Sequence, residues 1–136
     1  MQTSKEVILL YNIQPDERLH MFLNLLDRLS LSYRILSTED AEQTLGFLLD
    51  KNGFAHIDTA SSVSAPQGEM MIFSNLSDLH LDTLLKTLRT SGIPPVALKA
   101  VVTETNINWP LKKLYANLLM EHLQMRRLQQ KGPGQA

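Results

Sequence analysis

The sequence contains no cysteine, which excludes disulfide bonds, thiolate zinc sites and cysteine nucleophiles. Its glycines are scattered, and none forms a GxGxxG or GxxxxGKS/T phosphate signature or a GxSxG nucleophile elbow. None of the four histidines has a second histidine at metal-ligand spacing. We therefore predict no cofactor, no metal site and no catalytic triad or carboxylate pair.

Long hydrophobic runs are absent as well. The first apolar run, residues 7–11, is far shorter than the ~20 residues that span a bilayer, and no small-residue cleavage site follows it. The 13 Lys and Arg residues nearly balance the 14 Asp and Glu residues, so the net charge of -1 supplies no global field that attracts nucleic acid. We expect a cytoplasmic protein with neither a membrane nor a nucleic acid as its partner.

The chain has 136 residues, of which 43% are apolar and 20% are charged. Such a composition is typical of a globular protein, and a chain of this length buries roughly two-thirds of the surface that it exposes when unfolded. We assign residues 1–130 to a single α/β domain and residues 131–136, which contain Gly and Pro, to a disordered tail.

Short apolar runs alternate along the chain with segments of helical periodicity. Strands are predicted at residues 7–11, 33–36, 70–73 and 97–103. Helices are predicted to begin near Asp16, Thr38, Asp78 and Pro110, and the last one continues to about Leu128. Residues 54–68 form the one long loop, of a kind that is often functional or mobile. This alternation predicts an α/β fold with a four-stranded, mostly parallel sheet and helices packed on it.

Two parts of the sequence are similar to each other. Residues 10–13 (Leu-Tyr-Asn-Ile) resemble residues 73–76 (Phe-Ser-Asn-Leu), and the helices that follow share the same leucine spacing. The chain would then consist of two βαβ halves, although any two βαβ units share such a pattern. The alternative fold is a ferredoxin-like α+β arrangement with an antiparallel sheet and an inserted second helix.

The most distinctive stretch fixes polar residues as well as apolar ones. A Lys-Ala-Val strand at residues 99–101 is followed by Thr-x-x-Asn at residues 103–106, then by Trp109 and a helix that has Glu121 near its end. This stretch resembles a bacterial family known as domain of unknown function 3783. The resemblance covers about residues 70–125, with a weaker match at the first strand, and it implies no particular activity. The residues that it highlights are Lys99, Thr103, Asn106 and Trp109.

Polar side chains follow the predicted strands at their carboxyl ends, where ligands bind in open α/β sheets. The loop after the fourth strand also leads into a helix N-terminus, where free N–H groups favour anions. The candidate ligand-binding residues of this polar rim are Asn12, Ser74, Asn75, Thr103, Thr105 and Asn106, with Trp109 as an apolar wall. Thr and Asn also occur in turns and helix caps for purely structural reasons. Our first hypothesis is a non-enzymatic binding or regulatory module that holds an unknown protein or a small polar ligand at the rim.

Lys99 lies within an otherwise apolar strand, where an unpaired buried ammonium group is costly. Three interpretations are open. Lys99 lies on an edge strand and discourages sheet pairing, it pairs with a carboxylate such as Glu104 or Glu121, or it contacts a ligand and joins the candidate binding residues. A second hypothesis for the function follows from the last interpretation: an unrecognised enzyme in which Lys99 faces a pocket with a lowered pKa.

Charge is distributed unevenly along the chain. Residues 110–136 contain five Lys or Arg residues and one acidic residue, a net charge of +4, whereas residues 1–109 contain eight and thirteen, a net charge of -5. The four cations of the final helix fall short of the about 6–10 phosphate contacts common in duplex binding, so we interpret them as a solvated face. A third hypothesis is a structural homo-oligomer that assembles through those apolar side chains of this helix that its own domain leaves spare.

Overall fold

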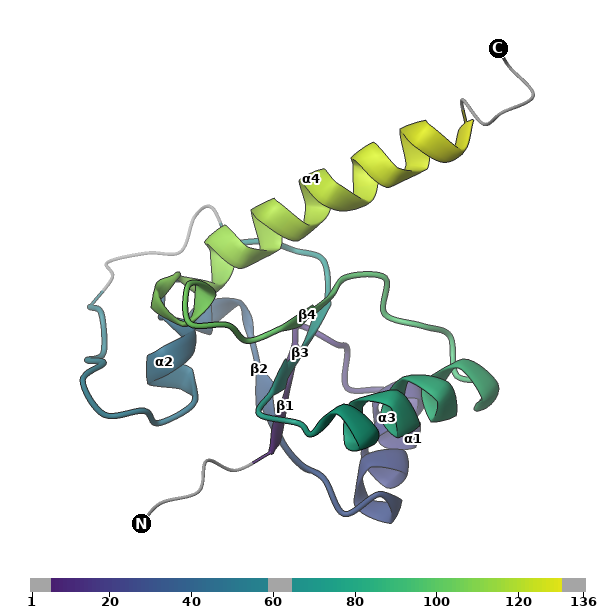
Figure 1. Ribbon diagram of the computed structural model, residues 1–136. Helices are drawn as coiled ribbons and strands as arrows, with labels where there is room; N and C mark the ends of the chain where they lie inside the picture. The colour runs from purple at the N-terminus through teal and green to yellow at the C-terminus, as the bar shows by residue number, and fades with distance from the viewer. Residues whose placement is uncertain (1–5, 59–64, 131–136) are drawn as a thin grey trace.

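The computed structural model describes residues 6–58 and 65–130 (Figure 1). Within them the chain forms a sheet with helices on both faces. The strands are β1 (Val7–Tyr11), β2 (Ser32–Leu36), β3 (Met70–Ser74) and β4 (Lys99–Val101), in the spatial order β2-β1-β3-β4. The predicted tail at residues 131–136 and part of the predicted long loop lie outside the described residues.

The helices form one layer on each face of the sheet. The α-helices are α1 (Glu17–Arg28), α2 (Leu45–Leu48), α3 (Asp78–Thr90) and α4 (Leu111–Gln130), and the 3-10 helices are η1 (Thr38–Asp40) and η2 (Asn106–Asn108). In β1, Ile8 and Leu10 contact the layer of α1 and α3, whereas Leu9 and Tyr11 contact the layer of α2 and α4. Because both faces are covered, β1 is continuously apolar instead of alternating. No helix in the described part of the chain is long and apolar enough to cross a membrane.

The strand directions are mixed. β1 pairs with β2 in parallel and β3 pairs with β4 in parallel, but the two central strands, β1 and β3, are antiparallel. Two of the three pairings are parallel, which confirms the predicted α/β fold with a four-stranded, mostly parallel sheet. The ferredoxin-like alternative is wrong, because it requires an antiparallel sheet.

The two predicted βαβ halves are present as β1-α1-β2 and β3-α3-β4. Each half has two residues with positive φ, and they lie at equivalent places in the two halves. Asn12 (φ 54°) and Asn75 (φ 62°) follow the first strand of each half, and Ser30 (φ 58°) and Gly92 (φ 82°) follow its helix. Asparagine tolerates this left-handed conformation better than most residues, because its short side chain forms local hydrogen bonds. The similarity between the halves thus extends to the backbone of their turns.

The second predicted helix is split into η1 and α2. Ser37 and Asp40 form a reciprocal cap around η1, and Thr44 caps α2 separately. Between the two caps, the carbonyl groups of Ala41 and Gln43 accept hydrogen bonds from the first amides of α4. These carbonyl groups are therefore not available to amides four residues further on, which a continuous helix requires.

Strand β4 is shorter than the predicted residues 97–103. The side-chain amide of Asn106 donates to the carbonyl of Val101 (3.1 Å), and its Oδ1 accepts from the amide of Thr103 (2.7 Å). These bonds close the chain after Val101 into a turn, and β4 ends at Val101.

Candidate functional site

The antiparallel pairing of β1 and β3 divides the predicted polar rim. Tyr11, the last residue of β1, lies beside Met70, the first residue of β3. Asn12 therefore lies at one end of the sheet, and Ser74 and Asn75 lie at the opposite end. The expectation that these side chains meet at one rim is wrong, since it depends on β1 and β3 running in the same direction.

At the first end, polar side chains hold the segment that leads into β3. The side-chain amide of Asn12 donates to the carbonyl of Gln67 (2.7 Å), and the hydroxyl of Tyr11 donates to the carbonyl of Pro66 (2.8 Å). Burial raises the pKa of Tyr11 to about 12, so its hydroxyl keeps its proton at neutral pH. Both groups bond to the protein's own backbone and fasten this segment over the end of β1.

At the opposite end, the polar residues after β4 form a turn. The amide of Thr103 donates to Asn106 Oδ1 (2.7 Å), and the amide of Asn106 donates to Thr103 Oγ1 (3.0 Å). Thr105 precedes η2. Trp109 packs against the α2 and α4 side of the core, with Lys113 Nζ 4.6 Å from the centre of one of its rings. These contacts are those of a turn and a core residue, which is the structural alternative to a binding rim.

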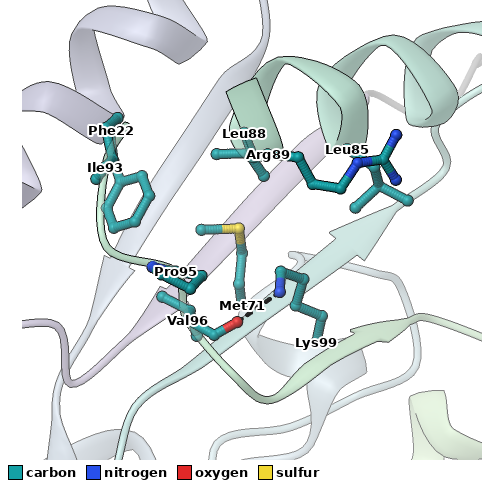
Figure 2. A pocket seen from close by; sticks show the side chains of 9 residues that line it. All are labelled: Phe22, Met71, Leu85, Leu88, Arg89, Ile93, Pro95, Val96 and Lys99. Atoms are coloured by element: carbon teal, nitrogen blue, oxygen red, sulfur yellow. Dashed lines mark hydrogen bonds between the residues drawn. The ribbon is translucent and has the colours of Figure 1, made fainter. Parts of the chain in front are cut away.

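Lys99 is placed differently, on the edge strand β4. It is in register with Met71, so both side chains lie on the face that α1 and α3 cover. The ammonium group is half-buried and donates to the carbonyl of Val96 (2.5 Å; Figure 2). Burial lowers the pKa of Lys99 below its usual 10.5. Among the described acidic residues, neither Glu104 nor Glu121 nor any other forms an ion pair with Lys99.

A pocket of about 200 Å³ lies next to Lys99. Gly92, in its left-handed conformation, ends α3, and the following loop returns to the sheet. Figure 2 shows α3 on one side of the pocket, the loop on another, and Met71 and Lys99 from the sheet between them. The lining residues are Phe22, Met71, Leu85, Leu88, Arg89, Ile93, Pro95, Val96 and Lys99.

Arg18 of α1 fastens the loop that forms one wall of the pocket. Its guanidinium group donates to the carbonyls of Pro94 (2.9 Å) and Pro95 (2.8 Å). The same group pairs with both carboxylate oxygens of Glu69, each at 2.7 Å. It also lies 5.2 Å from the centre of the ring of Phe22, another lining residue. The planar fork of arginine suits such simultaneous contacts, so Arg18 fixes the loop relative to α1 and the start of β3.

The pocket combines apolar walls with a single half-buried ammonium group. An ammonium group has three donor positions. In the described part of the chain, Lys99 uses one of them, to the backbone carbonyl of Val96. The exposed Arg89 adds a second cation to the lining, whereas the described lining residues include no carboxylate and no imidazole. Such a site can hold an anion that has an apolar body.

The sequence pattern indicates Lys99 but not the rest of this site. A lysine in an apolar strand is a local signal, and of the three interpretations left open for it, the position on an edge strand agrees with the observed strand order. Arg18 has no such signal, because it meets Pro94 across 76 positions of the chain. The two consecutive prolines offer one clue: they lack an N–H and favour a loop outside the sheet, where their carbonyl groups can accept from a side chain.

Comparison with known proteins concerns only a segment of the chain. No curated protein and no solved structure matches this chain. The matched segment runs from the residue before β3 through α3 and β4 into α4, and it includes Lys99 and most of the pocket lining but not α1 with Arg18. As the Lys-Ala-Val strand and the Thr-x-x-Asn turn predicted, residues 69–125 match the family model described as a domain of unknown function, DUF3783.

Proposed function

We propose that this protein is a non-enzymatic binding module and that the pocket beside Lys99 holds a small organic anion with an apolar body. One observation carries the proposal: a half-buried ammonium group in an apolar pocket has no ion-pair partner among the described residues. A cation in such surroundings gains most from an anion that also covers the apolar walls. A monocarboxylate satisfies both requirements.

The size of the pocket limits the ligand. An apolar cavity of about 150 Å³ accommodates benzene. The pocket here, at about 200 Å³, therefore suits one ring or a short branched chain with a single anionic group. This ligand differs from the small polar ligand predicted for the rim, because the rim side chains bond largely to the protein's own backbone.

Binding is favoured over catalysis by the composition of the lining. Proton transfer in an enzyme needs a titratable group within reach of the reacting atom. The titratable groups of the described lining are Lys99 and Arg89, and arginine does not release its proton in proteins. The cytoplasmic location predicted from the sequence remains part of this proposal.

A titration with benzoate, followed by calorimetry and by amide shifts in NMR spectra, tests this function. Benzoate is expected to bind at least tenfold more tightly than benzamide, which lacks the charge, and than acetate, which lacks the ring. Lys99→Met keeps an unbranched side chain and removes the charge, and we expect a loss of tenfold or more, since a hydrogen bond to a charged group contributes about 1.5–3 kcal/mol. Lys86→Met, at an exposed position of α3, is the matched control.

Several results of this titration would contradict the proposal. Equal affinity of benzoate for the wild type and for Lys99→Met would show that the ammonium group does not contribute to binding. Amide shifts at residues other than the lining residues would show that benzoate binds outside the pocket. Because burial lowers the pKa of Lys99, the affinity is also expected to fall at a pH below 10.5, where an ordinary lysine would still be charged.

The lowered pKa also favours a second candidate function, because the neutral amine of lysine is a nucleophile. In this reaction the amine of Lys99 attacks the carbonyl carbon of an aldehyde, and loss of water leaves an imine. Borohydride then adds hydride to the imine and leaves a stable secondary amine. Benzaldehyde with borohydride is expected to label Lys99 faster than Lys86 in a peptide mass map, and equal labelling would exclude this function.

A further inference from the structure

The second half of α4 projects from the body of the protein (Figure 1). Leu111 and Leu114 at its start are buried against the sheet. Farther along, five large apolar side chains are exposed: Leu119, Met120, Leu123, Met125 and Leu128. We call residues 118–128 the helix tip. Large apolar side chains that gather in water on one projecting helix indicate an interaction site.

The apolar residues of α4 also keep the spacing of a helix–helix seam. Leu111, Leu114, Leu118, Met125 and Leu128 follow steps of three and four residues, with Glu121 at the one position that breaks the pattern. A repeat of 3.5 residues lets one helix pack along another. The first part of this seam packs on the sheet, whereas Met125 and Leu128 are 56% and 66% exposed. The spacing therefore points to a helix as the missing cover.

We propose that the helix tip pairs with the tip of a second copy of this chain in antiparallel orientation. Arg126 and Arg127 lie near the C-terminal end of α4, and a parallel pair would gather all four arginines of the two copies at one place. An antiparallel pair separates them and sets the two helix dipoles against each other. It also brings each arginine pair toward the partner's body, whose residues 1–109 carry a net charge of -5.

A second copy also matches the width of the exposed surface. At 100° per residue, Leu119, Met120 and Leu123 lie on the side of the helix away from the seam. A partner that is only a helix would leave this side in water. A second copy brings its own α4 together with the body on which that helix rests, and so offers the tip more surface than a lone helix does. A twofold axis uses the same surface twice and closes the assembly as a dimer.

The seam also defines the register of the pair. When the two seams run in opposite directions, Leu118 of one copy faces Leu128 of the other, and Glu121 faces Met125. The two Glu121 side chains then lie in neighbouring layers near the middle of the contact, where like charges repel each other. A polar residue in a seam lowers stability and selects the register. We therefore expect a reversible dimer that Glu121→Leu strengthens.

Sedimentation velocity over a range of protein concentrations tests the association. The mass of the wild type is expected to rise from 15.4 kDa toward twice that value. The double variant Met125→Glu/Leu128→Glu changes exposed residues, so its circular dichroism should stay native while it remains monomeric at every concentration. Glu121→Leu should lower the dissociation constant at least tenfold. Met21→Glu, at an exposed apolar position of α1, should leave the association unchanged.

The orientation can be tested by disulfide trapping, because the wild-type chain contains no cysteine. A mixture of the Leu118→Cys and Leu128→Cys proteins in oxidised glutathione is expected to form the mixed disulfide in excess of either symmetric one. Predominance of the symmetric Leu128→Cys dimer would overturn the antiparallel orientation. A wild type that stays at 15.4 kDa throughout would overturn the dimer. If that monomer also bound phosphatidylglycerol vesicles through the tip, a membrane surface would replace the second copy as the partner.

Discussion

Replacing Ser30 by glycine should stabilise the protein, although the substitution removes side-chain atoms. After α1, the amide of Ser30 donates to the carbonyl of Asp27 (3.0 Å), and the amide of Leu31 donates to the carbonyl of Leu26 (2.9 Å). These two bonds are those of a Schellman turn, which needs a left-handed residue at this position. Ser30 has a φ of 58°, and a residue with a Cβ loses about 1–2 kcal/mol in that conformation.

The net effect is smaller than this strain, because glycine is more flexible when the chain is unfolded. That flexibility reduces the gain by about 0.5–1 kcal/mol, which leaves a net stabilisation of about 0.5–1 kcal/mol for Ser30→Gly. Gly92 occupies the equivalent position after α3, with a φ of 82°, and no atom beyond its two chain neighbours lies within 4 Å of the place that a Cβ would occupy. Gly92→Ala should therefore cost a similar amount through backbone strain alone.

Thermal unfolding and urea unfolding, each followed by circular dichroism and by the fluorescence of the single tryptophan, Trp109, measure both changes. For a chain of this length, the melting temperature should rise by about 2–4 °C for Ser30→Gly and fall by a similar amount for Gly92→Ala. Ser32→Gly, in the extended strand β2, is the matched control and should be destabilising. A lower urea midpoint for Ser30→Gly, or an unchanged one for Gly92→Ala, would refute this reasoning.

Three further predictions concern the core, the pH dependence and the pocket. Leu84→Ala removes a side chain of α3 that is 0% exposed and should lower the unfolding free energy by about 2–5 kcal/mol in urea titrations. The carboxylate of Glu6 accepts from the amide of Ser77 (3.0 Å), and chiefly this bond lowers the pKa of Glu6 below 4.5. Its contribution to stability is present above that pH and is lost as the pH falls, so Glu6→Gln should flatten the acid side of a plot of melting temperature against pH. Arg18→Met releases the loop wall and should weaken benzoate binding about tenfold, with faster amide hydrogen exchange at Val96.

The secondary structure is largely predictable because most elements depend on local pattern. The apolar run of β1 predicts a strand covered on both faces, and its neighbours Ile8 and Leu9 do face opposite layers. Helix α3 begins at Asp78, as its sequence predicts. The break between η1 and α2 is not predictable in this way, because the carbonyl of Gln43 bonds to the amide of Leu111, far away in the chain.

The candidate site is predictable only in part. A charged residue in an apolar strand singles out Lys99 from the sequence, whatever its surroundings. The polar residues after the strands are equally visible, but their residue types do not distinguish a ligand contact from a cap. For Thr103 and Asn106, the hydrogen bonds between these two residues show that they stabilise their own turn.

Local pattern is sufficient to place the four strands, the helices α1, α3 and α4 and the two βαβ halves, because each depends on the spacing of neighbouring apolar residues. The direction of β3 against β1 is set by long-range packing, since a strand covered on both faces has the same apolar pattern whichever way it runs. That direction separates Asn12 from Asn75 and divides the predicted rim. The pocket beside Lys99 also depends on contacts between distant segments, above all that of Arg18 with the loop after α3, and no local pattern encodes such a contact.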